Sequence, residues 1–146
     1  MMQKLYAFLA RAPALRGLTV QVGDVGPAPG TAGLWAGGIT VLDRRQNLLG
    51  TVRQRCRAEF TLRLCLPLPP GDSATAAENE ARLLALQAWI AAESAAHRTP
   101  VLGSEPQQEC LRAEQGRMER AEPGGTAIYT LRLQAEYTQL YTEEMQ

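Results

Sequence analysis

The chain has 146 residues, 45% of them hydrophobic, so it can bury one core and is expected to form a single domain over residues 1–146. Fifteen basic residues balance fifteen acidic ones, and this zero net charge argues against a free-standing nucleic-acid-binding domain, which usually carries a basic excess. No apolar stretch approaches the ~20 residues of a membrane span and no secretory signal is complete, so we expect a soluble intracellular protein.

The N-terminal segment predicts a short helix followed by a short strand. Residues 2–12 place Phe8 and other apolar side chains on one helical face, and Pro13 ends the pattern. Residues 18–22, with the sequence LTVQV, are rich in residues that favour strands.

A loop and an interrupted strand come next. Glycine and proline recur through residues 23–33, which predicts a loop. Residues 34–45 look like a strand with a bulge or close backbone approach at Gly37 and Gly38, and residues 46–50 form a connecting turn.

The clearest pattern in the chain runs from Val52 to Leu66, where mainly apolar and mainly polar residues alternate. Period two sustained over this length is typical of a strand with one buried face. At ~3.3 Å per residue the strand would be about 50 Å long, so we expect it to bend or to project as part of a hairpin.

Residues 75–97 predict the main helix. Thr75 is the expected N-cap, with Glu78 as its capping-box partner. Repeated alanines favour the helix. A tryptophan on the apolar face of such a helix, here Trp89, belongs more often to the core than to a binding hot spot.

The C-terminal third predicts a loop over 97–107 and a closing hairpin. Residues 109–121 have the composition of a helix, but Gly116 and the turn at 122–125 favour a strand. Residues 126–141 alternate again and predict a strand whose tyrosines, at positions 129, 137 and 141, lie on the packing face.

These elements predict an α+β fold: a mainly antiparallel sheet, one long helix packed across its apolar face, a short N-terminal helix and a projecting long β-hairpin. The expected core is apolar and aromatic, and it comprises Phe8, Phe60, Leu62, Leu83, Leu86, Trp89, Ile90, Tyr129, Leu131 and Leu133.

Four arginines, Arg53, Arg55, Arg57 and Arg63, stand on the polar side of the long strand. They lack the surrounding basic field of a DNA-binding surface, and arginine rarely transfers protons. A solvated sheet face paired with Glu114, Glu119 or Glu136 is the favoured interpretation, and a subunit or channel interface is the alternative.

The sequence predicts no catalytic, metal-binding or cofactor-binding residue. Three cysteines without CxxC spacing make a poor disulfide framework and a poor zinc site, and His97 is the single histidine. A cysteine–histidine pair distant in sequence stays open as an alternative, although Cys56 lies on the apolar side of its strand.

Three segments resemble a family of small tailed-phage proteins, the tail-terminator or tail-completion (minor capsid) proteins. The matching stretches are TVRQRCRAEF at 51–60, LQAWIAAESAAHRTPVLG at 86–103 and YTLRLQAEYTQLY at 129–141. The resemblance covers most of the chain, and its motifs are structural rather than chemical. This chain has more alanine and arginine than that pattern, and RCRAEF stands where the family is more aromatic.

The resemblance implies a non-enzymatic virion or prophage protein that assembles in the bacterial host cytoplasm. Such a protein forms a homo-oligomeric ring, six subunits by the resemblance, at the head-proximal end of the tail tube. It ends tube polymerisation and offers a surface for head joining. The implied partners are a second copy of itself, the tail tube protein and the head–tail connector protein. Membrane and sequence-specific nucleic acid are not expected as partners, although DNA passes through the ring.

Two rival functions remain. One is another head–tail connector or tail tube component of similar fold, which would form long tubes by itself. The other is a small cytosolic ligand-binding or enzymatic α+β domain, which would need a concave pocket with convergent polar groups.

Overall fold

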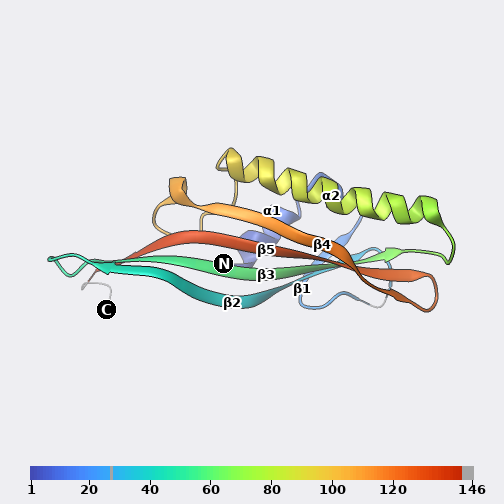
Figure 1. Cartoon of the computed structure of the whole chain (residues 1–146), viewed down its shortest axis with the longest axis horizontal. Coiled ribbons are helices and arrows are strands. Elements are labelled where there is room, and N and C mark those ends of the chain that lie inside the picture. The colour runs from blue at the N-terminus through green and yellow to red at the C-terminus, as the bar shows by residue number, and fades with distance from the viewer. Residues whose placement is uncertain (27, 143–146) are drawn as a thin grey trace.

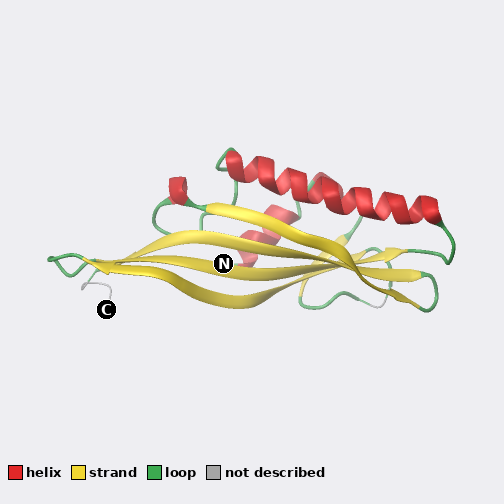
Figure 2. Cartoon of the chain, in the orientation of Figure 1, coloured by secondary structure: helices red, strands yellow, loops and turns green. Residues whose placement is uncertain are grey.

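The computed structural model describes residues 1–26 and 28–142, and it has a five-stranded sheet with two helices against its apolar face (Figures 1 and 2). Pro27, in the predicted loop, and residues 143–146 lie outside the described part. The elements in chain order are α1 (Met2–Leu9), η1 (Pro13–Leu15), β1 (Thr19–Val22), β2 (Thr31–Gln46), β3 (Val52–Pro67), α2 (Ser73–Ala95), η2 (Pro106–Gln108), β4 (Cys110–Glu122) and β5 (Thr126–Tyr141).

The sheet has the strand order β1-β2-β3-β5-β4, and only the β1–β2 pair is parallel. The other three pairs are antiparallel, so β3 and β5 form the centre of the sheet. The predicted α+β fold with a mainly antiparallel sheet is therefore confirmed.

The long strand folds as its alternation predicts. From Cys56 to Leu64 every second residue of β3 is buried and those between are partly exposed. The β2–β3 hairpin extends outwards from this buried part, and its tip projects past the end of α2 (Figure 1). Gly37 and Gly38 fall at a register shift between Ala36 and Gly38, as the predicted bulge requires.

The core lies between the apolar sheet face and the two helices. All the core residues predicted from sequence are buried except Trp89, which is half-buried and stacks on Phe8 with 4.7 Å between ring centroids. This stack joins α1 to α2. Of the three tyrosines assigned to the packing face, Tyr129 and Tyr137 are buried, but Tyr141 is exposed at the end of β5.

The N-cap of α2 corrects the sequence prediction. The helix starts at Ser73, its N-cap is Asp72, and the Asp72 carboxylate accepts hydrogen bonds from the backbone N–H and the hydroxyl of Thr75. Thr75 therefore lies in the first turn of the helix rather than before it. Asp72 is the better cap because a carboxylate also interacts favourably with the positive end of the helix dipole.

Other boundaries also differ. The N-terminal helix ends at Leu9, three residues short of the expected end. Strand β2 begins at Thr31, inside the predicted loop, because β1 and β3 pair with this small-residue segment from both sides. The ambiguous segment at 109–121 is a strand. Within the described residues, neither helix combines the length and apolarity needed to cross a bilayer.

Candidate functional site

The four arginines lie on the sheet face opposite the helices, and each is engaged within the chain. Arg53 forms a two-pronged contact with Glu105 at 2.9 and 3.1 Å. Arg55 donates to the Gln108 carbonyl at 2.8 Å and to the Thr138 hydroxyl at 3.2 Å. These contacts fasten the η2 segment against the sheet.

The other two arginines form the predicted cross-strand pairs. Arg57 lies 4.0 Å from Glu136, and Arg63 lies 2.9 Å from Glu119. Arg63 also sits over the Trp35 ring, 4.6 Å from its centroid. Among the described ion pairs none joins Glu114 to these arginines.

The Arg53 contact has an electrostatic consequence. Its hydrogen bonds hold the pKa of Glu105 below the ordinary value, and partial burial opposes this shift. The partners Glu105 and Gln108 come from the irregular segment before β4, which no sequence pattern placed beside the strand.

A second feature is the open edge of β2. Strand β1 covers this edge only at Thr31–Leu34, so the rest of β2 has a neighbour on one side alone. The regular stretch Gly38–Val41 lies between the bulges at Gly37 and Leu42 and carries no charge. Ile39 and Val41 in it are 58% and 51% exposed. A regular, uncharged and apolar edge is a site where another chain can pair.

The hairpin tip carries exposed apolar side chains on a hydrogen-bonded turn. The Asn47 side chain accepts hydrogen bonds from the backbone N–H groups of Leu49 and Thr51. Gly50 takes the positive φ of 86° that closes the turn. Leu48 and Leu49 are exposed on this ordered turn. Exposed leucines on an ordered projection are typical of a contact surface.

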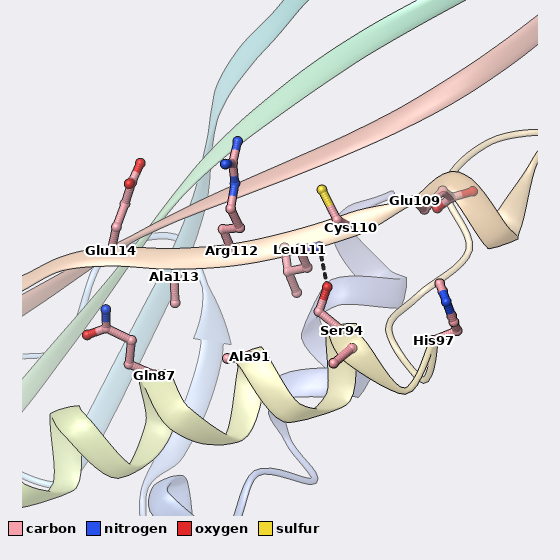
Figure 3. Close-up of a pocket in the computed structure, with 11 residues that line it drawn as sticks. Gln87, Ala91, Ser94, His97, Glu109, Cys110, Leu111, Arg112, Ala113 and Glu114 are labelled. Atoms are coloured by element: carbon pink, nitrogen blue, oxygen red, sulfur yellow. Dashed lines mark hydrogen bonds between the residues drawn. The ribbon is translucent and has the colours of Figure 1, made fainter.

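A groove of about 630 Å³ runs between the C-terminal half of α2 and β4 (Figure 3). Its walls include Ala91 on the helix and Leu111 and Ala113 on the strand. Ser94 reaches from the helix to accept a hydrogen bond from the Leu111 N–H at 3.0 Å. The groove therefore lies along the outer edge of the sheet, on the side opposite to β2.

The polar groups around this groove do not converge as a catalytic site requires. Glu109 uses its carboxylate to accept from the backbone N–H groups of Leu102 and Gly103. In Figure 3 the Cys110 thiol points away from α2, while His97 lies beyond the helix end. The distant cysteine–histidine pair left open by sequence is therefore not assembled by Cys110 and His97.

Cys56 and Cys65 are buried and all three cysteines are free thiols. Burial raises the pKa of the Cys65 thiol. Within residues 1–26 and 28–142, no group of three or more histidine, cysteine or acidic side chains is placed to hold a metal ion.

No protein-family model matches this sequence, and no curated protein matches it either. The described surfaces on which another molecule could dock are the projecting hairpin, the open edge of β2 and the groove beside β4.

Proposed function

We propose that this chain is a structural virion or prophage protein that forms a ring at the head-proximal end of a phage tail tube. In this role it ends tube polymerisation and presents the surface that joins the head. The observation that carries the proposal is the projecting β2–β3 hairpin, which combines an unpaired strand edge with exposed apolar residues. A monomer with such an edge is prone to pair with another chain.

The resemblance to tail-terminator proteins supplies the place of assembly. Its matched segment at 51–60 is half of the hairpin, and its segment at 86–103 includes the end of α2 that borders the edge groove. The resembling segments therefore include part of β3 in the hairpin and the helix wall of the groove, whereas the open β2 edge and the β4 wall lie outside them.

The contacts of the four arginines explain a role in the fold and do not by themselves indicate a subunit interface. Because Arg53 and Arg55 hold η2, and Arg57 and Arg63 pair across strands, reversing their charge would disturb the fold as well as any interface. A subunit or lumen role for this row is compatible with these contacts but does not follow from them.

Native mass spectrometry over a concentration series, with negative-stain imaging of the same samples, tests the proposal. We expect a closed ring of one size, six subunits by the resemblance. Open-ended tubes would assign the chain to the tube instead. A monomer at every concentration, and also after mixing with tail tubes that lack their terminator, would overturn the proposal.

A further inference from the structure

We propose that the open edge of β2 in one copy docks on the β4 edge and the α2–β4 groove of the next copy. The contact presupposes the self-assembly proposed above and specifies which two surfaces make it. The occupant of the groove is therefore a second copy of this chain.

The strand register brings the two surfaces to the same level. Following the paired residues across the sheet, Thr40 leads through Arg57 and Glu136 to Cys110. In the same way Ile39 lies in one cross-strand row with Leu111. The exposed apolar stretch of β2 is thus level with the groove on the other edge.

Strand directions fit the same contact. The sheet alternates in direction from β2 through β3 and β5 to β4, so β2 and β4 run antiparallel within one copy. A neighbour in the same orientation, related by rotation without a shift along the strands, would pair its β2 antiparallel with β4. A repeated contact without such a shift can close into a ring rather than continue as a helical filament.

The free backbone groups of the two edges also fall in the same rows. On β4 the Leu111 N–H points outwards to Ser94, so Ala113, two residues on, has the same orientation. On β2 the Leu34 carbonyl points outwards and accepts from the Gly23 N–H, so the backbone groups of Ala36 also point outwards. Because Gly37 is an extra residue in the bulge, the next residue whose backbone groups point outwards is Ile39.

These residues then face one another across the contact. Ala36 shares a row with Ala113, and Ile39 shares one with Leu111. Since Ser94 already accepts from the Leu111 N–H, the pairing at that row uses the Leu111 carbonyl. The backbone groups of Ala113 complete it. The Ile39 side chain enters the groove beside Ala91 and Leu111.

The outlines of the two edges are complementary. The regular part of β4, from Cys110 to Glu114, is level with the uncovered part of β2. The bulged part of β4 is level with the part of β2 that β1 covers, since Thr31 and Arg120 share a row. In the proposed contact, the end of β2 that carries β1 therefore lies beside the bulged end of β4 in the next copy.

Disulfide trapping tests this contact, because the native Cys110 supplies one thiol. Thr40→Cys places the second thiol in the same row, at a non-hydrogen-bonded pair where Cα atoms are about 4.5 Å apart and a disulfide can form. Thr40 is exposed, so the substitution should leave the fold intact. Mild oxidation should give a ladder of covalent oligomers that ends at the ring size and collapses on reduction.

Two variants control the experiment. Thr40→Cys combined with Cys110→Ser should give no ladder. Ile39→Cys, whose side chain lies on the opposite face of the strand, should give at least about tenfold less cross-linked product, since β-strand side chains alternate. A ring in native mass spectrometry without cross-linking of the Thr40→Cys variant would overturn the contact and leave the proposed function standing. A chain that never assembles would overturn both.

Discussion

Replacing Glu109 with alanine should destabilise the fold by about 3 kcal/mol, because two backbone donors lose their acceptor. Glu109 is buried at the entrance to β4. Its two carboxylate oxygens accept from the N–H of Leu102 at 2.8 Å and from that of Gly103 at 3.0 Å. The side chain therefore closes the loop between α2 and β4, and this loop leads into the strand that borders the groove.

The magnitude follows from the two bonds. A hydrogen bond to a charged group contributes roughly 1.5–3 kcal/mol, and both donors here are half-buried, so the lower end applies to each. Glu109→Gln keeps one acceptor oxygen and turns an amide donor towards the other N–H. Its cost should be about 1.5 kcal/mol or more.

Equilibrium urea unfolding at one fixed protein concentration measures these differences, since assembly would otherwise raise the apparent stability. Glu114→Ala is the matched control, because this half-buried glutamate lies on β4 shortly after Glu109 and no hydrogen bond of its side chain is found within the described residues. The control should stay within about 0.5 kcal/mol of the original chain. An equally small effect of Glu109→Ala would refute the assignment of the carboxylate as the support of this loop.

Two further outcomes are expected. Gly33→Ala should lower Tm by about 5 °C in a thermal unfolding scan, because a Cβ there would overlap the Gly23 carbonyl. The control Gly26→Ala should hardly change Tm, because the added Cβ would make only an ordinary 3.5 Å contact. Equal Tm values for the two variants would contradict this reasoning. Glu105→Gln should lower Tm at pH 7, and the gap from the original chain should close in acid. The Arg53 contact lowers the Glu105 pKa, so its stabilisation exists above the unfolded value near 4.5 and disappears as the pH falls through the folded value. A gap unchanged from pH 7 to about pH 2.5 would contradict it.

Sequence predicts most of the fold where one face of an element is buried. The alternation from Val52 to Leu66 placed β3 to within a residue, because its buried face forces period two on the sequence. The 109–121 segment was ambiguous because most of β4 is exposed and rich in helix-favouring glutamate and arginine. Its pairing with β5 makes it a strand, and this pairing is a tertiary interaction that the local sequence pattern does not reveal.

The candidate site could be predicted in part. Both partners Glu119 and Glu136 of the arginine row were expected; Glu136 lies on the adjacent strand β5, whereas Arg63 reaches Glu119 on β4 across β5. Glu105 reaches Arg53 from an irregular segment, so no periodic pattern indicated it. The groove beside β4 could not be foreseen either, because it depends on where α2 rests at the edge of the sheet.

The two edge regions of this sheet, on β4 and on β2, differ in how they are protected from pairing, and this difference supports the proposed assembly. On β4, α2 reaches over the edge through Ser94, and two bulges interrupt the rest of the strand. The bulges discourage pairing beyond Glu114, so the regular stretch Cys110–Glu114 is the part of this edge that can accept a neighbour. On β2, the short strand β1 protects one end, and a bulge and charged residues follow the other, but the regular stretch Gly38–Val41 between the bulges keeps an uncovered edge. A monomer that left this stretch open would risk aggregation, and the neighbour proposed above would cover it.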